Sequence, residues 1–123
     1  MISDFLDTDQ WERELRLLAI RHEVIAVHVT DPREFELPPV GILAVVDAET
    51  GRQRYVNTTA SVRQKYSAAA RLRHQGITST IHGSGAEYLH LSTDRDAISD
   101  TVHFTTHRRA RRAASSHTGL VLR

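Results

Sequence analysis

The chain lacks cysteine altogether, and only 6% of its 123 residues are aromatic. Without a thiol it can form no disulfide framework, no zinc–thiolate site and no cysteine nucleophile. No apolar run approaches the roughly 20 residues of a membrane-spanning helix, and no stretch has the pattern of a secretory signal. These absences, with 40% hydrophobic residues, predict one cytoplasmic domain with no membrane association.

Motifs of several catalytic sites are missing as well. The segment Gly83-Ser84-Gly85 precedes an expected strand rather than a helix, so it predicts no phosphate loop. His28 and His90 lie inside expected strands without a nucleophile nearby in the sequence, and they are interpreted as hydrogen-bonded core or edge histidines. His103 and His107 have a spacing that can bind zinc, but HFTTH lacks the glutamate of HExxH. We therefore expect no catalytic residues and no cofactor.

Acidic residues are absent from the C-terminal end. Residues 1–107 contain eleven lysines and arginines against fifteen acids, a net charge of −4, which argues against a nucleic-acid-binding face on that part. We predict a folded domain at 1–107 and a basic, flexible tail at 108–123. An alternative function is binding of nucleic acid or an acidic partner through the tail's arginines, which are Arg108, Arg109, Arg111, Arg112 and Arg123.

The segment EVIAVHVTDPRE, Glu23 to Glu34, contains the most apolar run of the chain. Only His28 interrupts its apolar residues, which predicts a strand buried on both faces of a parallel sheet. Proline then stops the strand and opens a polar loop at its carboxyl end, where α/β sheets bind ligands. Asp31, Arg33 and Glu34 are therefore candidate partner-binding residues; the alternative is a solvated turn with a local ion pair.

An amphipathic helix is predicted before this strand. Asp9 followed by Glu12 is an aspartate form of the capping box, and Glu12 can pair with Arg16 one turn later. Its apolar face comprises Trp11, Leu15, Leu18, Ala19 and His22.

A hairpin, a helix, a strand and a helix are predicted after the central strand. The last helix should bury Ala97, Ile98 and Val102, and from Ala113 the chain should be frayed. The four elements are the hairpin Ile42–Val46 with Arg54–Asn57, a helix capped by Thr58, Thr59 or Ser61, a strand at Tyr88–Leu91, and a helix whose capped start is Thr93 with Asp96.

This ordered series is similar to a known family. SDFLD, WERELRLLAIRHEVIAVHVTDPRE, ELPPVGIL, DAETGRQRYVNT, VRQKY and LHLSTDRD together resemble the C-terminal half of the bacterial "domain of unknown function 58" proteins, which look like von Willebrand factor type A domains. The resemblance covers Ile2 to about Phe104. It implies an α/β fold, namely a Rossmann-like partial doubly wound sheet with an inserted β-hairpin.

The resemblance also implies a metal site in intact relatives. A metal-ion-dependent adhesion site takes an Asp-x-Ser-x-Ser motif, a threonine and an aspartate after the fourth strand, and only the last is matched here, by Asp4. Since Mg²⁺ needs several oxygen ligands, we expect Mg²⁺ binding only in a full-length parent, and Asp4 alone is interpreted as a loop carboxylate.

Relatives of this family are often encoded beside MoxR-type AAA+ ATPases and are thought to act as adaptors or co-chaperones. The resemblance therefore implies a non-enzymatic protein-protein interaction domain, with a small hydrolase as a second alternative. In a von Willebrand A-like sheet, the two residues before Ser3 could not cover the strand Val24 to Thr30. We expect the exposed edge to produce a dimer or higher oligomer.

Overall fold

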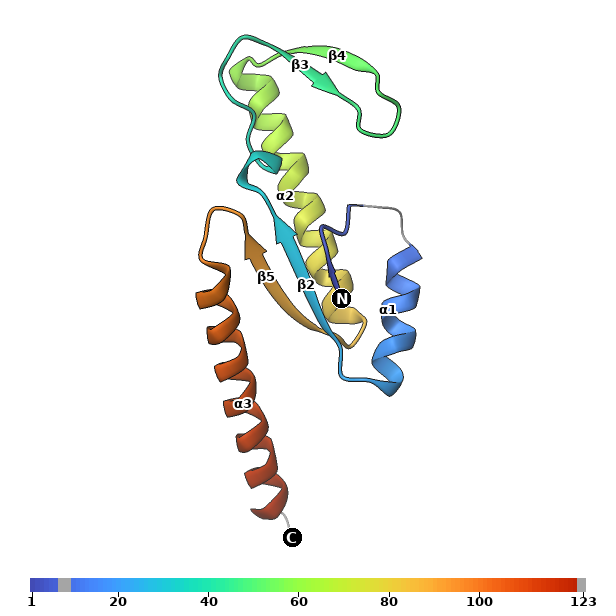
Figure 1. Cartoon of the computed structure of the whole chain (residues 1–123), viewed down its shortest axis with the longest axis vertical. Coiled ribbons are helices and arrows are strands. Elements are labelled where there is room, and N and C mark those ends of the chain that lie inside the picture. Colours follow the sequence, from blue (N-terminus) through green and yellow to red (C-terminus); the bar gives the residue numbers. More distant parts are fainter. Residues whose placement is uncertain (7–9, 122–123) are drawn as a thin grey trace. The chain divides into compact units, whose positions relative to one another are not determined.

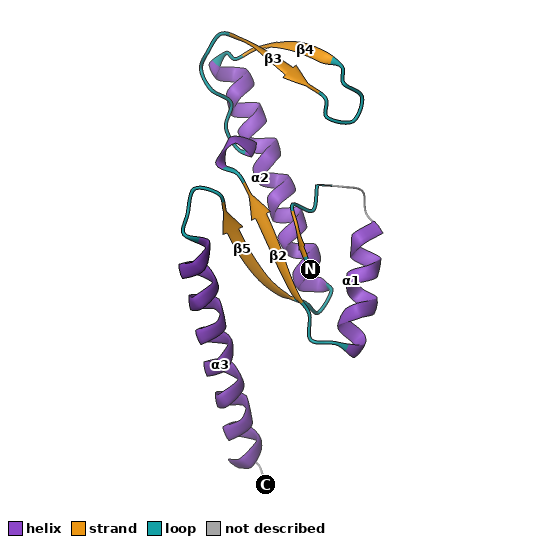
Figure 2. Ribbon diagram, viewed as in Figure 1, coloured by secondary structure: helices purple, strands orange, loops and turns teal. Residues whose placement is uncertain are grey.

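The computed structural model describes residues 1–6 and 10–121, and side chains of the last helix as far as Ser116. The predicted order of elements is confirmed, and the fold is mixed α/β (Figures 1 and 2). The elements are β1 (Ile2–Ser3), α1 (Gln10–Arg21), β2 (Ile25–Thr30), the 3-10 turn η1 (Pro32–Glu34), β3 (Ile42–Val46), β4 (Gln53–Asn57), α2 (Ala60–Gly83), β5 (Glu87–Ser92) and α3 (Ala97–Val121).

The chain forms two compact units. Met1–Thr30 and Ile81–Arg123 make up the sheet unit, and Asp31–Thr80 makes up the hairpin unit. The C-terminal helix is grouped with the strands, and the expected boundary at residue 107 stays a prediction. Among the described helices, none combines the length and apolarity needed to cross a membrane.

The sheet unit contains three parallel strands in the order β1-β2-β5. β5 pairs with the full length of β2, from Ile25↔Glu87 to Thr30↔Ser92. β1 meets β2 only at Ile2↔Val27 and Ser3↔His28. The sheet therefore has a complete ladder on one side of β2 and a short one on the other.

One face of β2 is buried, and two of its three side chains are polar. Ala26, His28 and Thr30 are buried, whereas the apolar residues between them are only half-buried. The strand expected to be buried on both faces is thus fully buried on one. The face that carries His28 is the buried one because aromatic side chains from β5 and from the loop after β1 pack over it.

The two strand histidines, the buried His28 and the half-buried His90, have hydrogen-bond partners across the sheet, as predicted. The His28 ring nitrogen Nδ1 lies 3.0 Å from the Tyr88 hydroxyl, and the Thr30 hydroxyl lies 2.8 Å from Nε2 of His90. Phe5 packs edge-on against His28, with ring centroids 5.6 Å apart. A polar group removed from water needs such a partner to offset its lost hydration.

Helix α1 contacts this face through its first turns. Trp11 packs edge-on against Phe5 with ring centroids 4.8 Å apart, and Leu15 is completely buried. Leu18, expected on the same face, is 45% exposed. The predicted Glu12–Arg16 pair is present at 2.9 Å, while the predicted cap Asp9 lies outside the described residues.

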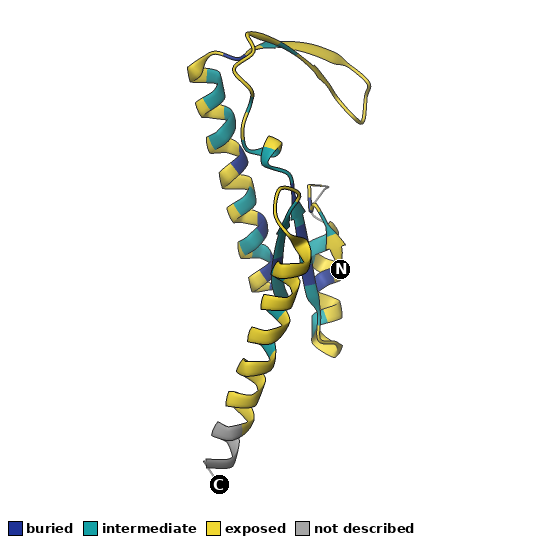
Figure 3. Ribbon diagram, turned by 60° about the vertical axis from the view of Figure 1, so that its left-hand side comes forward, coloured by how far each residue is buried: buried dark blue, intermediate teal, exposed yellow. Residues whose placement is uncertain are grey.

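Helix α3 contacts the sheet unit through a face that the sequence did not predict. Ile98 and Val102 are 77% and 57% exposed, and the less exposed residues are Asp100, Phe104 and Arg108, each four positions from the next. Figure 3 shows how exposed most of this helix is. Asp96, one of the two residues of the predicted capped start, caps it by accepting a 3.0 Å hydrogen bond from the N–H of Ile98.

The chain after Ala113 is helical to Val121 rather than frayed. Burial of apolar residues does not explain this extension, because the chain offers few of them there. The ion pairs between α3 and the sheet unit, described below, extend only as far as Arg112. The flexibility expected of residues 108–123 stays a prediction.

The hairpin unit contains the antiparallel pair β3–β4, paired from Ile42↔Asn57 to Val46↔Gln53. Asp47 organises the turn: its carboxylate accepts hydrogen bonds of 2.9 Å from the N–H of Glu49 and from the Thr50 hydroxyl. These bonds, led by the one from the Glu49 backbone, hold the pKa of Asp47 below its ordinary value. Gly51 takes the expected positive φ, at 69°.

The edge of the sheet at β1 generates a prediction about association. The Met1 amino group donates to the Ile25 carbonyl (3.0 Å), and the Val27 N–H donates to the Met1 carbonyl (2.7 Å). Backbone groups alternate sides along a strand, so the N–H and C=O of Ile2 face away from β2. The Ile2 side chain is also 75% exposed. This edge can pair with a second copy of the chain.

We therefore expect dimers or higher oligomers at high micromolar concentration, measured by light scattering. Ile2→Pro removes the outward N–H without removing a bond to β2, so it should shift the chain toward monomer. Circular dichroism checks that the variant folds. A wild-type chain that remains monomeric would refute the association.

The buried hydrogen bond of Tyr88 generates a second prediction. Tyr88→Phe removes the hydroxyl that bonds to His28 and should lower the free energy of unfolding by about 1 kcal/mol. Tyr55→Phe is the matched control, since Tyr55 is 73% exposed. Urea denaturation of both variants measures the difference. Equal stability of the two variants would contradict the role of the network.

Candidate protein-binding groove

The predicted partner-binding loop is a capped turn. The Asp31 carboxylate accepts a 2.9 Å hydrogen bond from the N–H of Arg33, and Glu34 accepts one of 3.2 Å from the N–H of Asp31. This reciprocal capping box holds η1, with Pro32 in its first turn. Arg33 lies 3.5 Å from Asp31, and its side chain is 93% exposed. The two acids thus have a structural role, and their binding of a partner stays a prediction.

The segment after η1 is attached to α2. The Ser67 hydroxyl donates a 2.6 Å hydrogen bond to the Phe35 carbonyl, and the Phe35 ring packs edge-on against His74 with centroids 5.5 Å apart. Further along, the Thr58 hydroxyl donates to the Gly41 carbonyl at 2.7 Å. These contacts place residues 36–41 between α2 and the hairpin.

An apolar groove of about 710 Å³ lies between this segment and β3. The hairpin leaves large apolar side chains exposed, among them Ile42 at 70%, Val46 at 61% and Tyr55 at 73%. Neighbouring exposed apolar residues of this size are typical of binding surfaces. The groove is lined by Pro32, Arg33, Glu36, Leu37, Pro38, Pro39, Leu43, Ala44, Val45, Val46 and Arg63.

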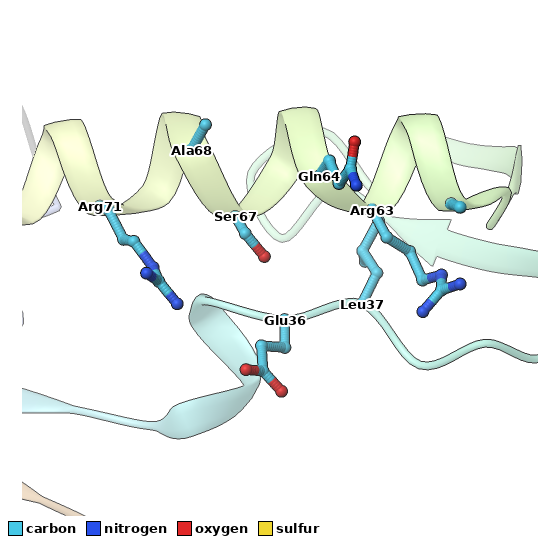
Figure 4. Close-up of a pocket in the computed structure, with 8 residues that line it drawn as sticks. Glu36, Leu37, Arg63, Gln64, Ser67, Ala68 and Arg71 are labelled. Carbon is cyan, nitrogen blue, oxygen red and sulfur yellow. The ribbon is translucent and has the colours of Figure 1, made fainter.

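A polar pocket of about 600 Å³ adjoins the groove and shares Glu36, Leu37 and Arg63 with it. Figure 4 shows the side chains of Arg63, Ser67 and Arg71 extending from α2 toward the segment that carries Glu36 and Leu37. These three residues are four positions apart and so lie on one face of the helix. The Arg63 Nε is buried and has no hydrogen-bond partner among the described residues.

Sequence analysis missed these two arginines, although a signal was present. Between Thr50 and Ala86 the chain has no Asp or Glu, yet it carries Arg52, Arg54, Arg63, Lys65, Arg71 and Arg73. A run of unneutralised cations on an internal helix indicates an anionic partner or a solvated face. The sequence does not distinguish an anionic partner from a solvated face, because the other side of the pocket, with Glu36 and Leu37, comes from a different segment of the chain.

Asp4, the candidate metal ligand, takes part in a tight turn. Its carboxylate accepts a 3.2 Å hydrogen bond from the N–H of Leu6, and the Ser3 hydroxyl accepts one of 3.0 Å from Phe5. Phe5 has a φ of 55°, and its side chain is 3% exposed. Within residues 1–6 and 10–121, no three His, Asp or Glu residues are placed to hold a metal ion. The Asp4 carboxylate thus helps to hold this turn, and its role as a metal ligand in a full-length parent stays a prediction.

The arginines of the C-terminal helix contact carboxylates of the sheet unit. The Arg108 Nε donates to both carboxylate oxygens of Glu87 at 3.0 Å, and one of its terminal nitrogens lies 3.1 Å from Glu23. Arg112 also pairs with Glu23, and Arg111 lies 3.8 Å from Glu87. The arginines expected in a separate tail thus join α3 to the strands.

Arg112 and then Arg108 hold the pKa of Glu23 below its ordinary value. Because the folded-state pKa is lowered, this contribution to stability is complete above the unfolded pKa. It is lost as the pH falls through the lowered value. Attachment of the C-terminal turns should therefore weaken in acid and in high salt.

Comparison with known proteins identifies relatives without an assigned activity. The family model "Protein of unknown function DUF58" matches residues 1–76. Uncharacterized proteins of Mycobacterium bovis and Mycobacterium tuberculosis are each 44% identical over 117 residues, which cover 95% of this chain and 37% of theirs. An uncharacterized protein of Mycobacterium avium is 44% identical over 109 residues, 89% of this chain and 64% of its own. The chain thus spans less than two thirds of each relative. No solved structure matches it.

The Arg108 contacts generate a stability prediction. The Arg108 side chain is 22% exposed, so Arg108→Gln should lower the free energy of unfolding by about 1 to 2 kcal/mol through loss of a charge-assisted pair. Arg109→Gln is the matched control, since Arg109 is exposed and makes no ion pair with the described residues. Thermal melts in low salt measure both. Equal melting temperatures of the two variants would show that these ion pairs do not stabilise the attachment of α3.

Proposed function

The chain belongs to the DUF58 family of proteins of unknown function, and from this premise we propose that it is a non-enzymatic protein-protein interaction domain. The observation that carries the proposal is the apolar groove of the hairpin unit, between Leu37-Pro38-Pro39 and β3. Prolines and aliphatic side chains form most of its lining. Their desolvation by a partner would provide the hydrophobic driving force for binding.

The described side chains support a binding role over a catalytic one. The buried His28 and the half-buried His90 are hydrogen-bonded to Tyr88 and Thr30, and Asp31 and Glu34 cap a turn. His103 and His107 lie on exposed positions of α3, with ring centroids 6.5 Å apart. None of these groups is arranged as a nucleophile with its base, so the hydrolase alternative has no supporting geometry.

The alternative of an arginine-tail binder is also less well supported. Arg108 and Arg112 are engaged by Glu23 and Glu87. A phosphate or an acidic partner would have to displace these carboxylates. The groove of the hairpin unit requires no such displacement.

For the partner, we propose a MoxR-type AAA+ ATPase, with the chain acting as adaptor or co-chaperone. This rests on the similarity of the ordered sequence segments to the family. We further propose that the sheet unit is part of a von Willebrand A-like sheet in which β3–β4 is an insertion. The parallel order β1-β2-β5 and the loops at the carboxyl ends of the strands support this.

Binding to the ATPase tests the proposal. The purified chain should bind a MoxR-type ATPase from the same organism in biolayer interferometry with ATP present. Val45→Asp places a carboxylate on the apolar groove, where desolvation should weaken binding about tenfold or more. Val102→Asp is the control, because Val102 is exposed on α3.

Two results would contradict the proposal. One is the absence of wild-type binding at concentrations up to about 100 μM, where even weak specific complexes are detectable. The other is equal loss of binding in both variants, since that would show no role for the groove. Circular dichroism of each variant excludes unfolding as the cause.

A further inference from the structure

The polar pocket of the hairpin unit carries more positive than negative charge, because Arg63 and Arg71 line it together with a single acid, Glu36. Among the residues that the structure describes, Arg63 and Arg71 form no ion pair, and neither pairs with Glu36 across the pocket. Helix α2 has no acid in its first turn, so the positive end of its macrodipole adds to the same sign. Such a surface favours a carboxylate or another anion.

The spacing of the two arginines limits the shape of the ligand. Eight residues of α-helix rise about 12 Å, so Arg63 and Arg71 start about that far apart on one face of α2. Four residues of extended chain span about 13 Å. An extended peptide with two acidic residues four positions apart therefore matches both guanidinium groups.

The adjoining groove indicates what lies beside the acidic residues. Arg63 lines both the polar pocket and the apolar groove, whereas Arg71 lines only the pocket. A chain that passes from Arg71 to Arg63 continues into the groove between Pro38-Pro39 and Leu43–Val46. The segment that follows the second acid should consequently be apolar.

Nucleic acid fits this surface less well than a peptide does. No aromatic side chain lines either cavity for base stacking. A phosphate backbone also offers no apolar group that could fill the apolar groove. Charge and hydrophobicity together favour a protein segment.

We propose that Arg63 and Arg71 recognise an extended acidic-apolar segment of the protein partner: two carboxylates four residues apart, flanked by aliphatic residues. The inference rests on the proposed function of the same groove and specifies which chemistry the partner presents. The arginines supply charge-assisted, orientation-dependent hydrogen bonds. The groove supplies the hydrophobic contact.

Fluorescence anisotropy with defined peptides tests this. The probes are two fluorescein-labelled peptides. In one, two glutamates four residues apart are followed by Leu-Val-Leu, and the other has the same residues in the reverse order. One of them should bind the full chain. Replacing both glutamates with glutamine should weaken its binding about tenfold or more, as expected for two charge-assisted contacts.

Matched charge variants locate the site. Arg63→Gln with Arg71→Gln should weaken binding of the acidic peptide about tenfold or more and abolish discrimination between the glutamate and glutamine peptides. Lys65→Gln with Arg73→Gln removes the same charge from exposed positions of α2 that line neither cavity, and it should change affinity less than about twofold.

Failure of this inference is distinguishable from failure of the proposed function. Absence of peptide binding, equal loss in both double variants, or tighter binding of a 12-nucleotide single-stranded DNA than of either peptide would overturn the inference. If the Arg63 and Arg71 double variant binds the MoxR-type ATPase as the wild type does, the inference fails while the proposed function stands. If the wild type does not bind the ATPase, the proposed function fails, and the peptide result still decides the inference.

Discussion

The pairing of β2 with β5 is the interaction on which the sheet unit depends. Six residue pairs join the two strands, whereas β1 adds two. His28 and Tyr88, whose side chains are hydrogen-bonded across the two strands, are 60 positions apart in the sequence, a span that contains the whole hairpin unit. Closing so long a segment costs entropy, which the ladder and its buried side chains must offset together. The bonds from His28 and Thr30 to the side chains of β5 also disfavour any slip of the register, because a shift of one residue would turn these groups to the other face.

The hairpin unit is organised by different forces. An isolated two-stranded hairpin is marginally stable in water, and here the bonds from Thr58 to Gly41 and from Ser67 to Phe35 connect its ends and connector to α2. They leave the apolar side of β3 and the arginine face of α2 accessible. The apolar groove is costly to leave in water, and the neighbouring positive charge would favour a partner with complementary charge.

Local patterns predicted the elements well because each is specified by neighbouring residues. The β-branched run of β2, the Asp47 to Gly51 turn and the Asp96 cap all act within a few positions. The assignment of faces was less reliable. Ile98 and Val102 satisfy the helical period, yet the less exposed residues of α3 are Asp100, Phe104 and Arg108, and Arg108 binds the carboxylates of Glu87 and Glu23.

The candidate groove could be predicted only in part. Asp31, Arg33 and Glu34 were selected from their place after a strand, and the structure shows two of them capping η1. Arg63 and Arg71 were not selected, although the acid-free stretch around them was visible in the sequence. Their place in one pocket with Glu36 and Leu37 depends on contacts between segments about 30 residues apart, such as the bond from Ser67 to Phe35.

The sequence by itself determined the α/β class, the order of the elements and the family, because hydrophobic period, capping residues and turn glycines act locally. Only the tertiary structure decided that the His28 face of β2 is buried, that the C-terminal arginines join the sheet unit, and that Arg63 and Arg71 share a cavity with an apolar groove. These outcomes depend on which surfaces meet. Long-range packing and charge pairing settle that, and no local pattern encodes either of them.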